Sequence, residues 1–141
     1  IKGLGPNSWG MSASISPSTG YSGYYGSQPI GHGHKLLEDG TVAPYGALSF
    51  LPFTPVESMA ALEHMYKIPG LVGEYGLYDA YSYVTKAKGD QPWIAESYLG
   101  IDKGLVLLMF ENYSTQLIWR LLHQNAHIQK GLQVLQFESK K

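Results

Sequence analysis

The sequence predicts an all-α fold in which long loops rich in glycine and tyrosine lead into helices. Helix start signals recur along the chain, and no stretch shows the alternation of apolar and polar residues that marks a half-buried strand. The 17 glycines and 11 tyrosines are concentrated before residue 83, which fits structured loops better than a compact bundle. We therefore expect residues 1–141 to form a single unit with a site built on loops.

The first half of the chain is expected to hold a loop-rich segment and two helices. Residues 1–42 carry turn signals and little periodicity. A short helix is predicted to begin at Pro44, because proline suits the first helical turn. The TPVE run at residues 54–57 combines an N-cap threonine with a proline and a glutamate, so it predicts a second helix that ends near Lys67. Both helices fall within about residues 43–67.

The second half repeats this order of loop and helix. Residues 71–91 are again rich in glycine and tyrosine and are expected to be loop or extended chain. Ser114 and Asn125 are the expected N-caps of the last two helices. In all, three helices are predicted within the range 103–136, over about residues 103–111, 115–123 and 126–135.

One of these predicted helices is too apolar to have a solvent-facing side. Leu105 to Phe110 is an unbroken apolar run, so the helix needs neighbours all round. Asp102 precedes it and Glu111 lies near its end, roughly half a turn away in azimuth and about 13 Å along the axis, so the two carboxylates should serve different places. The few predicted helices cannot surround it, and we expect the fold to be incomplete.

The composition excludes several classes of function. A formal net charge of -1 with 15% charged residues leaves no polybasic patch for nucleic acid or an anionic membrane surface. No apolar run approaches the roughly 20 residues of a membrane span, and the first residues lack the pattern of a signal peptide. The absence of cysteine excludes disulfides but does not distinguish cytoplasm from periplasm. We expect a soluble globular unit.

Several sequence motifs occur in a fixed order along about residues 9–137. They are NSWGMSAS, YYGSQP, DGTVAPYGALSFLPFTPVESMAALEHMY, YGLYDAYS, YLGIDKGLVLLMFENY and LIWRLL. With this set the chain resembles the bacterial glucoamylase-like domain, a family that includes the β-1,2-glucanases and the related domain of cyclic β-1,2-glucan synthases. The resemblance implies the C-terminal part of an (α/α)6 toroid, in which inner-helix ends and loops form a glycan-binding pocket.

The resemblance also implies a function and a partner. It indicates a glycoside hydrolase that acts on a glucan oligosaccharide by carboxylate acid/base chemistry without a cofactor. The alternatives left open are an α-glucan substrate and a non-catalytic glycan-binding or assembly fragment that completes a toroid with another chain. Members of the family are longer, and the acid that protonates the leaving group is implied to lie upstream. The chain departs from the family pattern at Ile15, Lys103 and Ser114, where members commonly carry an acidic residue, glutamine and arginine.

Asp102 and Asp79 are the candidate catalytic residues. Glycoside hydrolysis requires one carboxylic acid to protonate the departing oxygen and a second carboxylate to activate water or attack the sugar. Asp102 can be such a base or contact the sugar, or it can cap its helix; the GIDKG motif favours the first role by resemblance. Asp79 lies between aromatic residues that can cover the apolar faces of a sugar, but an Asx-turn accounts for it equally well.

Further residues are candidates for substrate binding. Aromatic rings can stack on glucose and polar groups can bond its hydroxyls, although each such residue can equally serve packing, a turn or a helix end. The candidates are Trp9, Ser14, Tyr21, Asp39, Tyr45 and Glu111. His32 and His34 alternate in a loop, and His123 and His127 have a spacing that can hold zinc. No acidic or thiol third ligand is near them, so no metal site is predicted.

Overall fold

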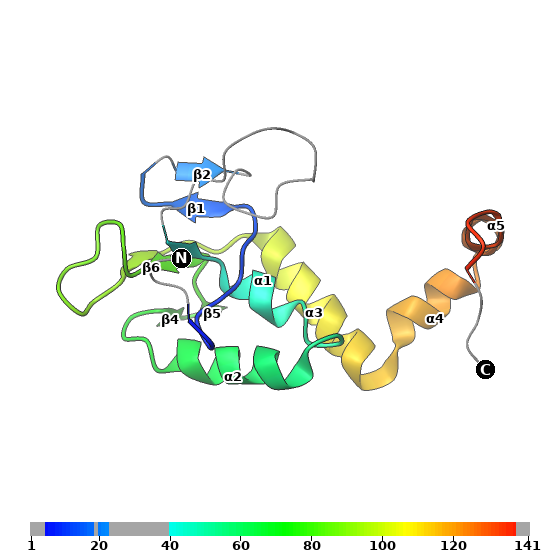
Figure 1. The fold of residues 1–141 in the computed structure, drawn as a ribbon, viewed down its shortest axis with the longest axis horizontal. Coiled ribbons are helices and arrows are strands. Elements are labelled where there is room, and N and C mark those ends of the chain that lie inside the picture. The colour runs from blue at the N-terminus through cyan, green and yellow to red at the C-terminus, as the bar shows by residue number, and fades with distance from the viewer. Residues whose placement is uncertain (1–4, 19, 23–39, 138–141) are drawn as a thin grey trace.

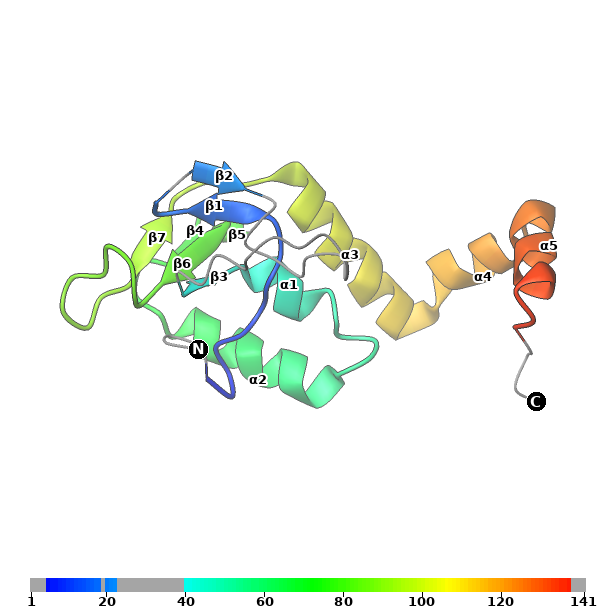
Figure 2. The ribbon, with the colours of Figure 1, turned by 45° about the horizontal axis from the view of Figure 1, so that its top comes forward.

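Small sheets and short helices pack together in the first part of the chain, and two further helices extend away from them (Figures 1 and 2). The structure, a computed structural model, describes residues 5–18, 20–22 and 40–137. Within these residues the chain forms three strands, then two helices, four strands and three helices. Helical and extended elements are therefore mixed along the sequence.

Seven short strands occur in the described residues. They are β1 (Ser14–Ser16), β2 (Gly20–Ser22), β3 (Thr41–Val42), β4 (Val72–Gly73), β5 (Gly76–Leu77), β6 (Ala80–Ser82) and β7 (Trp93–Ala95). β1 pairs with β2, β4 pairs with β5, and a three-stranded sheet has the order β3-β6-β7. All the pairs are antiparallel. The predicted all-α fold class is therefore wrong, because helices are combined with three small sheets.

These strands leave almost no trace in the sequence. Each has only two or three residues, which is too short for an alternating pattern to appear. β6 is in addition buried along its whole length, so its residues do not alternate in polarity. The loops expected from the glycine and tyrosine content thus contain paired segments held by backbone hydrogen bonds and by packing on the helices.

Three of the five helices found in the described chain begin where the sequence predicts. The helices are α1 (Pro44–Leu48), α2 (Pro55–Tyr66), α3 (Gly100–Thr115), α4 (Leu117–His123) and α5 (Ala126–Val134). Proline opens both α1 and α2, and the Asn125 side chain caps α5 by accepting two backbone N–H bonds. The predicted starts at Pro44, Pro55 and Ala126 are confirmed. None of these helices is long and apolar enough to cross a membrane.

The junction between α3 and α4 differs from the prediction. α3 continues to Thr115, so Ser114 lies inside a helix and does not cap the next one. Gln116 adopts a left-handed conformation with φ 59° between the two helices. The buried Asn112 supplies the missing acceptor, because its Oδ1 receives a hydrogen bond of 3.1 Å from the backbone N–H of Trp119. A side chain one turn from the end of α3 thus satisfies the start of α4.

The hydrophobic core lies where α1 and α2 meet the three-stranded sheet. Helix α1 contacts both α2 and α3, and Figure 2 shows these helices side by side. The core cluster comprises Val42, Ala47, Leu48, Ala61, Met65, Ile68, Leu71, Leu77 and Tyr81. Val106 and Phe110 pack against it from α3. One side of α3 therefore closes the core.

The other side of α3 is apolar and exposed. Ile101 is 77% exposed and Leu107 is 71% exposed, and Leu108 faces solvent as well. No residue of α4 or α5 is buried. The prediction that the Leu105–Phe110 helix is packed all round is wrong for this chain, whereas the expectation that the chain supplies too few neighbours for it is confirmed.

Candidate active site

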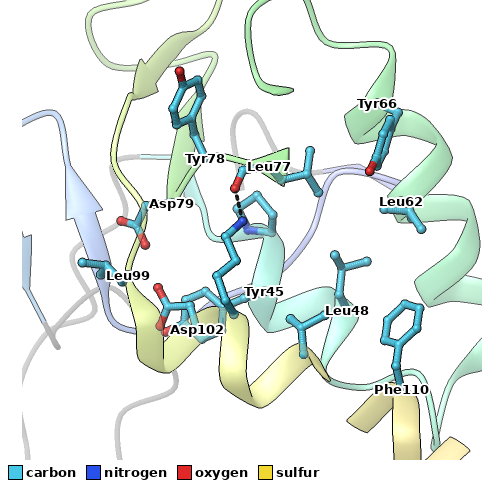
Figure 3. Close-up of a pocket in the computed structure, with 13 residues that line it drawn as sticks. Tyr45, Leu48, Leu62, Tyr66, Leu77, Tyr78, Asp79, Leu99, Asp102 and Phe110 are labelled. Carbon is cyan, nitrogen blue, oxygen red and sulfur yellow. Dashed lines mark hydrogen bonds between the residues drawn. The ribbon is translucent and has the colours of Figure 1, made fainter. Parts of the chain in front are cut away.

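A pocket of about 260 Å³ lies among α1, α2, α3 and the segment between β5 and β6 (Figure 3). Its apolar wall includes Leu48, Leu62, Val106 and Phe110. Its polar lining includes Tyr45, Asp79, Asp102 and Lys103. Both candidate catalytic residues and one candidate binding residue from the sequence therefore meet in one cavity.

Asp79 enters the pocket from the residue just before β6. Its side chain is only 5% exposed. Its Oδ2 accepts a hydrogen bond of 2.7 Å from the backbone N–H of Ile15 in β1, and its own backbone N–H donates to the carbonyl of Ser97 at 3.0 Å. The Asx-turn interpretation is wrong, since the partner of the carboxylate is far away in sequence. Asp79 joins two sheets and keeps Oδ1 without a hydrogen-bond partner.

Asp102 reaches the same cavity from the first turn of α3, where it is the third helical residue. Its side chain is 6% exposed. The residue before the helix is Leu99, and no side chain caps α3, so the prediction that Asp102 is an N-cap is wrong. Its Oδ2 is buried and has no hydrogen-bond partner. A buried carboxylate oxygen left in this state favours protonation.

The two carboxyl groups point toward one another (Figure 3). The pKa of Asp102 is raised from 3.8 to about 7, first by burial and then by the neighbouring carboxyl group of Asp79 and its charge. One proton shared by the pair satisfies the oxygens that otherwise lack partners. Asp102 therefore exchanges a proton near neutral pH, which suits general acid or base catalysis.

Lys103 is the cation of the pocket. Its Nζ donates a hydrogen bond to the carbonyl oxygen of Leu77, drawn as a dashed line in Figure 3, and lies 5.2 Å from the centre of the Tyr98 ring. Burial lowers the pKa of Lys103, while the charges of Asp102 and Asp79 oppose that change. The positive charge partly counteracts the rise in the pKa of Asp102.

Of the candidate binding residues Tyr45 and Ser14, Tyr45 lines the pocket and Ser14 does not. Tyr45 lines the pocket from α1, and its hydroxyl donates to the carbonyl of Ala13 at 2.5 Å; burial is the main cause that raises its pKa. Ser14 is fully buried in β1, and its Oγ has no hydrogen-bond partner. Tyr45 is thus a wall of the cavity that also anchors the chain before β1.

Trp9, Tyr21 and Glu111 are not among the residues that line the pocket. Trp9 is half-buried and packs against the hydrophobic core, while Tyr21 on β2 is 59% exposed. Glu111 accepts a 2.6 Å hydrogen bond at Oε1 from the hydroxyl of Thr115, within its own helix. Asp39 falls outside the described residues. Sugar contacts by these four residues stay predictions.

The four histidines considered as zinc ligands form two pairs in the sequence. His123 is the last residue of α4 and His127 the second residue of α5, so the pair does not share a helix. His32 and His34 fall outside the described residues. Among the residues that the structure does describe, no group of three or more histidine, aspartate or glutamate side chains is arranged to hold a metal ion.

A group of stacked tyrosines beside the pair was not predicted from the sequence. The rings of Tyr78 and Tyr98 stack with centroids 4.9 Å apart, and Tyr75 meets Tyr98 edge-on at 5.3 Å. A Cβ on Gly73 would lie 2.1 Å from the Tyr98 hydroxyl, so a glycine is needed where the hairpin approaches this stack. The clustering of tyrosines around Asp79 was the only signal of this group in the sequence.

The motifs and the pocket can be compared with known proteins. Residues 1–126 match the family model named Glycoamylase, described as "putative glucoamylase". The chain belongs to this family. The resemblance drawn from the motifs is confirmed, and the family assignment covers every described residue that lines the pocket.

The names of two relatives specify β-1,2-glucans as their substrates. The exo β-1,2-glucooligosaccharide sophorohydrolase (non-reducing end) of Parabacteroides distasonis is 35% identical over 136 residues, which is 95% of this chain and 17% of the relative. An endo-β-1,2-glucanase from Chitinophaga pinensis, in complex with sophorotriose and glucose, has a TM-score of 0.72 and 36% identity, over 94% of this chain and 29% of that one.

A third relative is a "putative glucoamylase" from Bacteroides fragilis. Its crystal structure has a TM-score of 0.74 and 37% identity, and the alignment covers 99% of this chain and 30% of that one. The chain thus spans less than a third of the length of each of these three relatives. It corresponds to one piece of a larger structural unit in them.

Proposed function

We propose that this chain contributes the Asp79–Asp102 pair to the active site of a glycoside hydrolase that acts on β-1,2-glucan. The observation that carries the proposal is the meeting of these two buried carboxyl groups in a pocket. Support for the substrate comes from two relatives whose names specify β-1,2-linked glucose. The proposal treats residues 1–141 as one unit within the domain.

The two carboxyl groups face each other inside the pocket (Figure 3), and this arrangement restricts their catalytic roles. Paired catalytic carboxyls that flank a glycosidic bond lie on opposite sides of it, about 5 Å or more apart, whereas Asp79 and Asp102 point toward one another and Asp79 raises the pKa of Asp102. They therefore act together as one of the two catalytic groups that the reaction requires. We assign Asp102 the role of base, which takes a proton from the water that attacks the anomeric carbon. Asp79 orients the carboxyl group of Asp102. A carboxylic acid from outside this chain protonates the leaving oxygen.

A second candidate function rests on the apolar face of α3. Because Ile101 and Leu107 are exposed and α4 and α5 bury no residue, the chain is suited to completing a larger unit with the rest of its domain or with another polypeptide. In that case it would provide a wall of a glycan-binding site, and the chemistry would lie wholly in the other part.

The test compares hydrolysis by the complete gene product that contains this chain with hydrolysis by single variants. β-1,2-Glucooligosaccharides are the substrate, α-1,4-linked maltooligosaccharides are the control for the other glucan class, and released reducing ends are measured. Asp102→Asn is expected to lower kcat at least about a hundredfold with little change in KM. Asp90→Asn, on an exposed loop, is the matched control. Near-normal kcat in Asp102→Asn would support the second function.

A further inference from the structure

The side chain of Lys103 links the segment that carries Asp79 to the helix that carries Asp102. Lys103 directly follows Asp102 in α3, and its Nζ donates to the carbonyl oxygen of Leu77, two residues before Asp79. Leu77 is itself held, because it is buried and pairs with Val72 across the β4–β5 hairpin. The hydrogen bond therefore joins the first turn of a helix to a strand end that is fixed from its other side.

The ammonium group of Lys103 has a second neighbour, the ring of Tyr98. Its Nζ lies over the ring of Tyr98, which precedes α3 and stacks on Tyr78. Tyr98 Oη in turn accepts a hydrogen bond of 3.2 Å from the backbone N–H of Tyr75. The ammonium group is thus held between an aromatic face and a backbone carbonyl, where few other orientations are open to it.

We infer that Lys103 is a positioning residue that holds the carboxyl groups of Asp79 and Asp102 against each other and keeps a positive charge beside them. This inference rests on the proposed function of the pair. Without the cation, the two carboxyl groups would meet only each other's negative charge when both are ionised, and they would separate or retain a proton to higher pH. Lys103 opposes both outcomes by its hydrogen bond and by its charge.

Few titratable or charged groups face Asp102 from the helices and strands that pack around it. Asp79 faces it from the start of β6 and Lys103 from its own helix, and both change its pKa. From α1 the neutral hydroxyl of Tyr45 senses both carboxylates, and from α2 the pocket receives Tyr66. Lys103 is therefore the one cation that affects the pKa of Asp102 among the residues that the structure describes.

Two substitutions separate the hydrogen bond from the charge. Lys103→Gln removes the charge and keeps an N–H donor for the Leu77 carbonyl, whereas Lys103→Met removes both and keeps an unbranched side chain. In the complete gene product we expect both variants to move the acid limb of kcat/KM upward by about one pH unit. Lys103→Met should in addition lower the plateau of kcat about tenfold, because the hydrogen bond that links α3 to the Leu77 carbonyl is lost and the two carboxyl groups are held less closely. Lys88→Met, in an exposed loop, should change neither.

A second readout makes the result independent of turnover. The carboxyl carbon of Asp102, assigned by comparison with Asp102→Asn in protein labelled with ¹³C-aspartate, is titrated by NMR in the parent and in both variants. An upward shift of its midpoint in both variants supports the inference even if the parent cleaves no β-1,2-glucan, a result that would overturn only the proposed function. If the parent is active and both the pH profile and the titration are unchanged in folded Lys103→Gln, the inference on Lys103 is overturned. Should Lys103→Met fail to fold, the Lys103→Gln comparison decides alone.

Discussion

Replacing Asp102 with asparagine should make the protein more stable in alkaline solution and leave its stability in acid almost unchanged. The amide keeps the shape of the side chain and can donate to the free Oδ1 of Asp79. It carries no charge at any pH. The ionised parent, by contrast, holds a second buried negative charge beside Asp79 whenever the pH is high enough to remove the shared proton.

The size of the effect follows from the pKa of Asp102. In the folded protein this pKa is about 7, compared with 3.8 for the free group, and each unit corresponds to about 1.4 kcal/mol. The shift of roughly three units sets a ceiling of about 4 kcal/mol, and water entering the pocket reduces it, so we expect about 1–3 kcal/mol.

The sign follows from the protons bound in each state. Between about pH 4 and pH 7 the unfolded carboxyl is already ionised while the folded one keeps its proton, so the parent loses stability as the pH rises through this window. Above pH 7 the loss is complete. Asp102→Asn lacks this dependence, and its advantage over the parent therefore grows from pH 4 to pH 8.

The assay is thermal unfolding of the complete gene product at pH 4, 6 and 8, with Asp90→Asn as the control for loss of an exposed carboxylate. The melting temperature of Asp102→Asn should exceed that of the parent at pH 8 and approach it at pH 4. A variant that is less stable than the parent by the same amount at every pH would refute the argument, because it would show that Asp102 acts through hydrogen bonds to the backbone and not through a buried charge.

Three further outcomes are expected. Asp79→Asn should move the acid limb of kcat/KM to lower pH, because loss of the neighbouring charge lowers the pKa of Asp102; an unmoved limb would mean that the two groups titrate separately. Gly73→Ala should lower the melting temperature by an amount equivalent to about 1–3 kcal/mol, since its Cβ would meet the Tyr98 hydroxyl, and an unchanged melting temperature would show that the stack can move. The isolated chain should self-associate through the apolar face of α3; sedimentation of a monodisperse monomer would contradict this.

Much of the helical structure could be predicted from the sequence, because the signals are local. Proline at Pro44 and Pro55 and the side chain of Asn125 act on backbone groups within a few residues, and the structure places helix starts where they indicate. The start of α4 was predicted wrongly, because the groups that satisfy its first backbone N–H groups are not the ones that the local pattern indicated. The backbone N–H groups of Leu117 and Trp119 donate to the side chains of Thr115 and Asn112 in α3, and the pattern at Ser114 did not indicate these acceptors.

The candidate site likewise has features that the sequence indicated and features that depend on the folded chain. The sequence by itself determined the family, through motifs in a fixed order, and it selected Asp79 and Asp102 as separate candidates on chemical grounds. Only the tertiary structure decided that they form a pair, because the contact requires the segment between β5 and β6 to meet the first turn of α3. Strands this short are stabilised by pairing and burial and not by their own pattern. The raised pKa, the place of Lys103 and the unpartnered face of α3 all depend on which distant residues share the low-dielectric interior, and so they appear only once the chain is folded.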